Sequence, residues 1–315
     1  MDALAEVLAV AGVRGTIAAT LNAVEPWGVA LGPLPGAAFH AVTVGTAWLH
    51  LDGRPGIRLM PGDVVLLPTG LAHTLASAPG TDLVPFDRLA AEQRPAVGGE
   101  AGGELQLGTG SAQTRILCAR YQQDPAVSLP LLTLLPEVLH IPAGRAGTAL
   151  DTTLRLLAHE VGQPRLGAVA VLNRVVDILL VQMLRAWLDT SPAGPGAGCW
   201  LRALLDPVAG PALTALHGQP GRDWTVDSLA AAAGVSRATL ARRFPAAVGA
   251  TPAAYLACWR MDLAARRLRD TEDTVGAIAR SLGYTSEYAF NRAFSRARGI
   301  TPGRYRTTSR HVAGS

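Results

Sequence analysis

The sequence predicts an α+β protein, in which an N-terminal β-barrel followed by helices precedes an all-α domain with two helix-turn-helix units. Short apolar runs separated by Gly, Pro and Asp fill residues 27–114, a pattern typical of small antiparallel barrels. Helical periodicity follows up to residue 190. Residues 224–305 then contain one sequence pattern twice, which indicates one supersecondary unit built twice.

The 315-residue chain is long enough for two domains, and its charge is divided unevenly between them. Residues 1–200 carry a net charge of −4, and residues 201–315 carry +8. A basic C-terminal third is typical of a domain that binds nucleic acid. The predicted boundaries are a barrel at 1–125, a helical segment packed on it at 126–190, a Pro- and Gly-rich linker at 191–199, a double helix-turn-helix domain at 200–308 and a tail at 309–315.

Three strands of the barrel can be placed with their turns. Phe39–Leu51 reads as one strand, because its apolar and β-branched residues end at the turn signal Asp52-Gly53. Ile57–Met60 and Val64–Leu67 predict two further strands on either side of a Pro-Gly-Asp turn.

The repeat predicts two short helices in each copy. Thr225 and Thr274 are N-cap candidates for the first helix, and a glycine ends that helix in both copies. Ser236 and Ser286 then cap a second, exposed helix. From the phenylalanine of each copy, Gly, Pro and Tyr follow at five, eight and eleven residues, which makes the two units matching helix-turn-helix motifs.

The exposed faces of the two second helices carry the candidate DNA-contacting residues. Arginine forks engage guanine or phosphate, and asparagine engages adenine. The alternative is a solvated basic face on a small helical domain, but matched caps in two copies favour recognition helices. The candidates are Arg237, Thr239, Arg242 and Arg243 in the first unit, and Glu287, Tyr288, Asn291, Arg292 and Arg296 in the second.

This C-terminal region resembles the DNA-binding domain of the AraC/XylS family, most closely at Gly283–Phe294. The resemblance implies double-stranded DNA as a partner, two successive major grooves as the binding surface, and a joining helix at Pro252–Leu268. By position, the base contacts that it implies fall on Arg237, Thr239 and Arg242 in the first unit, and on Glu287, Tyr288, Asn291 and Arg292 in the second. Ala238 and Ala241 stand where many members carry larger contact residues, so base reading in the first unit is reduced or shifted to Arg242 and Arg243.

The segment from Gly62 through Pro68 and Gly70 to His73 resembles the second motif of cupin barrels, in which the histidine binds metal. His40 takes one ligand position of a degraded first motif, and residues 40–51 contain no carboxylate. His50 is a possible third imidazole, since residues an even number apart share a strand face if no bulge intervenes. A metal ion at His40 and His73, a metal-free or vestigial site, and a catalytic site all remain open.

The layout of His40, Val42, Gly45 and Trp48 before the His73 loop resembles AraC-like regulators with a cupin-type sensor domain. That resemblance implies a small-molecule or redox effector, with His40, Trp48, His73 and Cys118 as the site residues. Arginine neighbours lower the thiol pKa of Cys118 if their side chains converge on it. The alternative is that Cys118 is a buried apolar residue.

The other cysteines and histidines receive structural interpretations. Three widely separated cysteines imply no disulfide framework, and Cys258, beside Trp259, is expected in the core. His140, His159 and His217 show no ligand spacing and are expected at the surface or at helix ends.

Three helices are expected between the barrel and the linker, at 129–139, 148–161 and 167–190. The resemblance implies that helices in this segment form the contact of a homodimer. The alternative is that their apolar stripe packs only within its own chain.

Taken together, the residues predict a bacterial transcriptional regulator of the cytoplasm that is no enzyme. No signal peptide is apparent, and charged residues interrupt the longest apolar stretch, so neither secretion nor membrane insertion is expected. One alternative is a cupin metalloenzyme or metal sensor with a DNA-binding appendage. Another is an architectural DNA-binding protein whose barrel serves only to form a dimer. The family that the C-terminal region resembles includes transcription activators, so the resemblance implies an activator.

Overall fold

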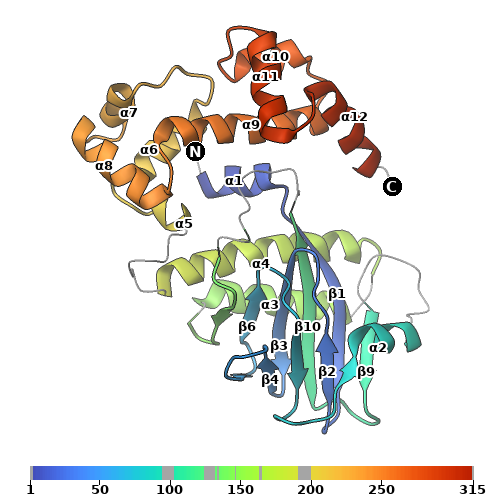
Figure 1. Ribbon diagram of the computed structural model, residues 1–315. Coiled ribbons are helices and arrows are strands. Elements are labelled where there is room, and N and C mark those ends of the chain that lie inside the picture. The colour runs from blue at the N-terminus through green and yellow to red at the C-terminus, as the bar shows by residue number, and fades with distance from the viewer. Residues whose placement is uncertain are drawn as a thin grey trace. The chain divides into compact units, whose positions relative to one another are not determined.

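The computed structural model describes residues 3–93, 103–123, 132, 135–145, 147–162, 165–190 and 200–313. The chain forms two compact units (Figure 1). Residues 13–122 and 135–192 form the barrel unit, and residues 1–12, 123–134 and 193–315 form the helical unit. No helix of the described residues is both long enough and apolar enough to cross a membrane.

The barrel unit is built from two sheets that face each other across an apolar interior. The six-stranded sheet contains, in spatial order, β11 (Leu139–Ile141), β6 (Val64–Leu67), β3 (Ala37–Val44), β10 (Thr114–Gln122), β1 (Arg14–Ala23) and β9 (Gly103–Leu107). The five-stranded sheet contains β5 (Ile57–Leu59), β4 (Ala47–His50), β7 (His73–Ala76), β2 (Gly28–Leu31) and β8 (Val84–Pro85). Leu49, Leu67, Leu75 and Ile116 are fully buried between the sheets, and burial of such side chains drives this packing.

The single strand predicted at Phe39–Leu51 is wrong, because β3 and β4 belong to different sheets. The chain turns between them at Gly45, whose φ is +70°, a conformation that is cheap only without a β-carbon. A β-carbon at Gly45 would also lie 2.3 Å from the Gln113 carbonyl oxygen. The strands predicted around the Pro-Gly-Asp turn are confirmed as β5 and β6.

Two long helices pack on the six-stranded sheet: α3 (Gly147–Gly162) and α4 (Ala168–Thr190). They confirm the helices predicted at 148–161 and 167–190. The apolar stripe of α4 is buried largely within its own chain, where it meets β1, β11 and α3. Tyr121 donates a hydrogen bond to the Val176 carbonyl oxygen at 2.8 Å, which ties the sheet to α4.

The helix predicted at 129–139 is wrong over its second half, because residues 135–138 are not helical and Leu139–Ile141 forms β11, which pairs with β6. Residues 129–131, 133 and 134 of that prediction lie outside the described part of the chain. His140 belongs to this strand, half-buried, with its Nε2 3.0 Å from an Asp63 carboxylate oxygen. A short helix, α2 (Phe86–Glu92), packs against β2 and β8.

The helical unit contains two copies of the predicted helix-turn-helix. The first is α7 (Val226–Ala232) with α8 (Arg237–Val248), and the second is α10 (Val275–Ser281) with α11 (Glu287–Arg298). All four predicted N-caps accept the expected amide: Thr225 from Ser228, Ser236 from Thr239, Thr274 from Ala277 and Ser286 from Ala289. Each cap satisfies an amide that the first helical turn leaves without a partner.

A long joining helix, α9 (Pro252–Asp270), forms the spine of this unit and confirms the helix predicted from Pro252. Phe244 and Trp259 are fully buried on the side of the first copy, and Phe290 and Phe294 on the side of the second. Around them lie α5 (Trp200–Ala203), α6 (Ala209–Gly218) and α12 (Pro302–Ala313). The N-terminal helix α1 (Ala3–Ala11) packs on α6 and α9, although the sequence prediction grouped residues 1–125 with the barrel.

Two expectations about the helical unit are wrong. Cys258 is exposed, because successive residues of a helix point about 100° apart and only Trp259 of the pair lies on the buried face of α9. His217 is buried rather than at the surface, because α6 places its ring against the aromatic rings of α9. His159 is exposed, as expected.

Candidate nucleic-acid interface and barrel cavity

The exposed face of α8 presents fewer free cations than its sequence suggests. Arg237 donates to Asp227 at 3.0 Å and Arg243 to Asp206 at 2.8 Å. Burial raises the pKa of the Asp206 carboxyl, but hydrogen bonds from the Ala209 and Val208 amides and from Arg243 outweigh burial and lower it overall. Arg242 is exposed and forms no ion pair with any described residue.

Thr239 has a local role that the sequence did not reveal. Its backbone amide and its hydroxyl both meet the Ser236 hydroxyl, at 3.2 Å and 2.9 Å, so its side chain completes the helix cap. Ala238 and Ala241 are exposed and small. Arg242 is therefore the long side chain of this face with the greatest freedom to reach a base or a phosphate.

The exposed face of α11 is richer in side chains that can read DNA. Tyr288 is 73% exposed, and the Arg292 guanidinium lies 5.9 Å from the centre of its ring, a weak cation–π arrangement that orients the arginine. Asn291 is half-buried beside them, and Arg296 is exposed one turn further on. Glu287 turns back toward α10 and places its carboxylate beside Gly276. A β-carbon added to Gly276 would lie 2.9 Å from that carboxylate.

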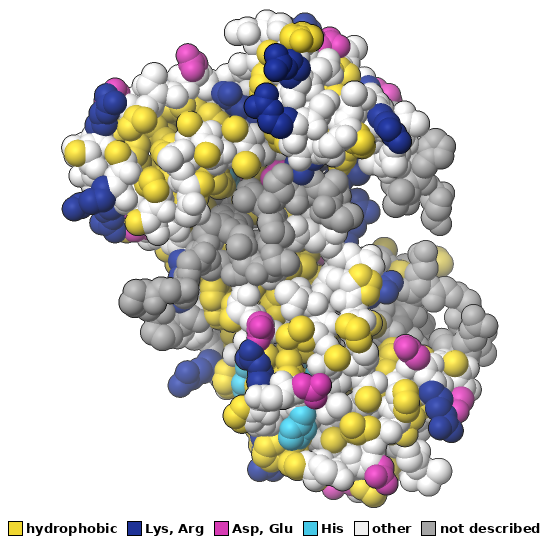
Figure 2. Space-filling view, viewed as in Figure 1, with side chains coloured by type: hydrophobic (Ala, Val, Ile, Leu, Met, Phe, Trp, Pro, Cys, Tyr) yellow, Lys and Arg dark blue, Asp and Glu magenta, His cyan; other side chains and the backbone are white. Residues whose placement is uncertain are grey.

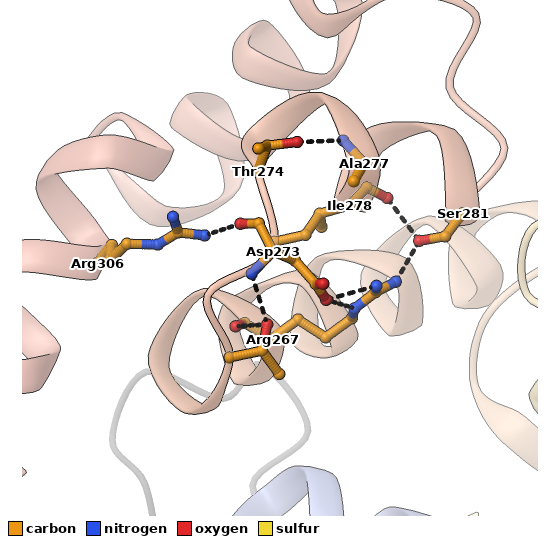
Figure 3. A network of polar contacts seen from close by, with 8 residues as sticks. Arg267, Asp273, Thr274, Ala277, Ile278, Ser281 and Arg306 are labelled. Atoms are coloured by element: carbon orange, nitrogen blue, oxygen red, sulfur yellow. Dashed lines mark hydrogen bonds and ion pairs between the residues drawn. The ribbon is translucent and has the colours of Figure 1, made fainter.

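Several arginines of this basic unit hold the fold instead of facing a ligand. Arg267 meets the Asp273 carboxylate at 2.6 Å and 3.1 Å and also reaches Ser281 (Figure 3). Arg306 donates to the Asp273 carbonyl oxygen, so one short loop is held from two helices (Figure 3). Arg298 of α11 pairs with the fully buried Asp262 of α9, which fixes the recognition helix to the spine. Sequence reasoning missed these roles, because an arginine's partner is set by packing.

The exposed faces of α8 and α11 together present arginine guanidinium groups, one aromatic ring and one side-chain amide. These groups suit phosphate oxygens and base edges of the major groove. On the face of the molecule drawn in Figure 2, arginine side chains stand apart among apolar and uncharged ones in the helical unit.

The barrel interior brings together three of the four predicted sensor residues. His40 of β3 lies opposite Cys118 of β10 in the strand register, and His73 enters from β7 in the other sheet. His40 Nδ1 lies 3.2 Å from Cys118 Sγ, and His40 Nε2 lies 2.8 Å from His73 Nε2. His73 Nδ1 meets the Leu71 carbonyl oxygen at 2.7 Å. All three side chains are buried.

Burial determines the protonation of this cluster. It lowers the pKa of His40 well below its usual value, and repulsion from His73 lowers it further. Burial also lowers the pKa of His73, although the Leu71 carbonyl opposes this. It raises the pKa of the Cys118 thiol to about 12, so the idea that neighbouring arginines lower it is wrong: Arg120 is exposed and Arg115 donates to Asn22 at 2.9 Å.

His40 and Cys118 line a cavity of about 590 Å³ in the barrel unit, within the 300–1,000 Å³ typical of small-molecule sites. Its other lining residues are mostly apolar. They are Thr16, Ile17, Ala18, Ala19, Leu31, Leu34, Ala38, Phe86, Ala90, Gly103, Leu105, Ala119, Arg120 and Asn173.

Trp48, the fourth predicted sensor residue, is not part of this group. Leu49 points into the core, so its neighbours Trp48 and His50 lie on the other face of β4, where their rings stack with centres 6.0 Å apart. The break at Gly45 and the change of sheet therefore remove both residues from the site that strand parity suggested.

The cluster does not fit a metal ion in its observed arrangement. His40 uses one ring nitrogen toward Cys118 and the other toward His73, so the three side chains do not converge on one point. Within the described part of the chain, no group of three or more His, Cys, Asp or Glu residues is arranged to hold a metal. A metal at His40 and His73 would require both rings to turn.

Comparison with known proteins covers both units. Residues 2–189 match a family described as cupin, and residues 229–308 match one described as a helix-turn-helix domain. Putative AraC-like transcription regulators of Streptomyces lividans and Streptomyces antibioticus are 38% and 36% identical, over 97% of this chain and 98% of each relative. The RCS-specific transcriptional activator RclR of Escherichia coli is 29% identical over 99% of this chain and 100% of that protein.

A solved structure is similar to part of this chain. The DNA-binding domain of AdpA in complex with a target DNA is 32% identical, covers 35% of this chain and 98% of that chain, and superposes with a TM-score of 0.32.

Proposed function

The chain belongs to the AraC-like transcription regulators, and from that premise we propose that a small-molecule or redox signal, taken up in the barrel cavity, controls its binding to DNA. That the chain is a DNA-binding regulator follows from its family. What we propose is the kind of signal that it senses and the site at which that signal acts. The observation that carries it is the cavity of about 590 Å³ that exposes His40 and Cys118 at its wall.

The cavity is built as a ligand site in two respects. Its walls are mostly apolar side chains, which gain free energy by excluding water when an apolar molecule enters. Its histidine has a fixed orientation, because both ring nitrogens of His40 form hydrogen bonds. A ligand controls the regulator only if it binds one arrangement of the protein better than another.

We expect the DNA bases to be contacted by Arg242 of α8 and by Tyr288, Asn291 and Arg292 of α11. These side chains are exposed or half-exposed on the two second helices, whereas Arg237 and Arg243 are partly engaged by acidic neighbours. A double-stranded site with unequal halves is expected, because the two faces differ in residue type. The second unit should contribute more of the sequence specificity.

A homodimer through the helices of the barrel unit is part of the same proposal. The buried stripe of α4 does not supply its surface, since that stripe packs within its own chain. Four large apolar residues remain exposed on α3 and α4: Leu156, Val169, Val171 and Ile178. Sedimentation of an Ile178→Glu variant tests this surface, and an unchanged mass would exclude Ile178 from the contact.

Arg242→Ala and Arg292→Ala test the assignment of the recognition faces. Each is expected to weaken specific DNA binding by about 1 to 3 kcal/mol, because each removes a charge-assisted contact to a base or phosphate. Quantitative gel-shift titration of the full chain measures the effect. Arg88→Ala is the matched control, since it removes an exposed charge in the barrel unit and should leave binding unchanged. Unchanged affinity in both test variants would exclude these helices as the readers.

A further inference from the structure

We propose that the barrel cavity binds small apolar monocarboxylates, with the carboxylate paired to Arg120 and the apolar part of the molecule against the cavity lining. This ligand class rests on the proposed sensing role of the barrel and names what is sensed. Within the described part of the chain, two features of the cavity carry it: one guanidinium without a partner, and a lining that is otherwise mostly apolar.

The strand register places Arg120 on the inner face of the six-stranded sheet. Arg120 lies on the same face of β10 as Cys118, because residues two apart in a strand point to the same side. Its register partners are Thr16 of β1 and Ala38 of β3, and both also line the cavity. Ala38 and Cys118 belong to the apolar core between the sheets. The Arg120 side chain therefore borders that core while remaining exposed to solvent.

The Arg120 guanidinium is free to bind a ligand. Among the residues that the structure describes, it has neither a hydrogen-bond partner nor an ion-pair partner. Arg115 of the same strand differs, because it donates to the Asn22 side chain at 2.9 Å. An unpaired guanidinium beside an apolar cavity provides a point of attachment for an anion.

No acidic side chain competes for this guanidinium from the described lining of the cavity. Glu104 stands between two lining residues of β9, so its own side chain points to the other face of the strand. Asp177 of α4 accepts a hydrogen bond from the Gly15 amide at 3.0 Å. His40 is neutral, because burial lowers its pKa. The described lining therefore carries a single positive charge, on Arg120.

A single guanidinium selects a carboxylate among possible ligands. Its planar fork donates two parallel hydrogen bonds to the two carboxylate oxygens. A phosphate dianion would need further cations, and a cationic ligand would be repelled. The Thr16 hydroxyl and the Asn173 amide also line the cavity and are additional donors. The rest of the ligand meets mostly apolar side chains and gains free energy by leaving water.

The cavity suits a compact ligand whose charge is at one end. In the register of β3 and β10, the pair of Cys118 and His40 is two residues from the pair of Arg120 and Ala38, roughly 7 Å along the strands. An apolar group that extends from Arg120 into the cavity reaches the His40 and Cys118 side chains. A phenyl ring on a short alkyl chain fits within the volume of about 590 Å³.

Calorimetric titration of the full chain with three probes of similar shape tests the need for a negative charge. The probes are phenylbutyrate, its neutral amide phenylbutyramide and the cation phenylbutylamine. Phenylbutyrate should bind about tenfold more tightly than the amide, a modest factor because solvent screens a pair formed by the exposed Arg120. The amine should bind more weakly than the amide, because Arg120 repels its charge.

Three variants locate the site. Arg120→Met keeps a long apolar side chain and removes the charge, so phenylbutyrate affinity should fall about tenfold while amide affinity is unchanged. Arg58→Met is the matched control, since Arg58 is an exposed strand arginine outside the cavity lining, and it should bind both probes as the wild type does. Ala90→Trp fills the cavity from α2 at a half-buried position and should reduce the binding of both probes alike.

Four results would overturn the inference. They are equal affinity for acid and amide in the wild type, a preference for the acid that survives in Arg120→Met, acid binding that Ala90→Trp leaves unchanged, and no saturable acid binding at millimolar concentration. A failure of the proposed sensing role is distinguishable, because phenylbutyrate would then bind through Arg120 and leave DNA affinity unchanged.

Discussion

Single buried side chains decide how the helical unit responds to pH. The His217 ring stacks on Trp259, with ring centres 4.1 Å apart, and lies beside Tyr255, whose ring centre is 5.8 Å away and whose hydroxyl is 2.7 Å from His217 Nε2. Burial lowers the pKa of His217 to about 4. Protonation would place a charge among aromatic rings with little water to solvate it, so the folded state favours the neutral ring.

The helical unit is therefore expected to lose stability as the pH falls from about 6.5 toward 4. In that window the unfolded chain binds a proton at His217 and the folded chain does not, so stability is complete above the unfolded pKa and declines below it. The loss attributable to His217 approaches roughly 3 kcal/mol at pH 4. Urea unfolding of the full chain and of a His217→Leu variant, at pH 7 and pH 5, measures the difference.

His40 and His73 contribute pH dependence of the same sign in the barrel unit, so the comparison between the two proteins, and not the wild type alone, isolates His217. His159→Leu is the control at an exposed position and should follow the wild type. An identical pH dependence in His217→Leu and the wild type would show that His217 is not buried in its neutral form.

At the scale of elements, the two helix-turn-helix units are equal in sequence pattern but unequal in their surroundings. Gly234 and Gly283 occupy the same place in the two turns, with φ values of +70° and +80°. A β-carbon on Gly234 would point into open space. One on Gly283 would lie 2.4 Å from the Gly221 carbonyl oxygen, because the second turn packs against a neighbouring loop.

The repeat thus provides a matched pair of substitutions. Gly234→Ala should cost about 1 kcal/mol of unfolding free energy, the strain of a left-handed residue with a β-carbon. Gly283→Ala should cost at least about 1 kcal/mol more, because backbone atoms must also move apart. Urea titration of both variants measures the difference, and equal costs would contradict the tight packing of the second turn.

At the scale of the whole molecule, charge is divided along the chain. The net charge of +8 in residues 201–315 contrasts with −4 in the residues before them. The structure divides the arginines again, into a set that holds helices together, such as Arg267, Arg298 and Arg306, and an exposed set on the two recognition faces. The arginines that hold helices together are less available to release counterions from DNA.

DNA affinity should therefore fall with rising salt, but less steeply than sixteen arginines would suggest. The slope of log K against log salt is about −0.9 for each phosphate contact on duplex DNA. Full-chain titrations at several salt concentrations measure it. Arg242→Ala should reduce the slope by at most about 1, and a slope independent of salt would exclude phosphate contacts as the main source of affinity.

Local patterns predicted the helical unit well because its information is local. N-caps, turn glycines and buried phenylalanines act within a few residues of the chain, and the predicted positions of Thr225, Ser236, Thr274 and Ser286 are confirmed as caps. Strand boundaries were harder, since a turn such as that at Gly45 depends on a strand some seventy residues away. The same distance in sequence explains why Trp48 was wrongly grouped with His40.

The sequence by itself determined the two-unit organisation, the double helix-turn-helix and the presence of His40, His73 and Cys118, because each follows from residue type and short spacing. Tertiary structure decided which of these residues meet. Cys118 lies 78 positions from His40 and 33 positions separate His40 from His73, and only the closure of two sheets over one interior brings them within 3.2 Å. Burial, a property of the assembled fold, then fixes their protonation and hence their chemistry.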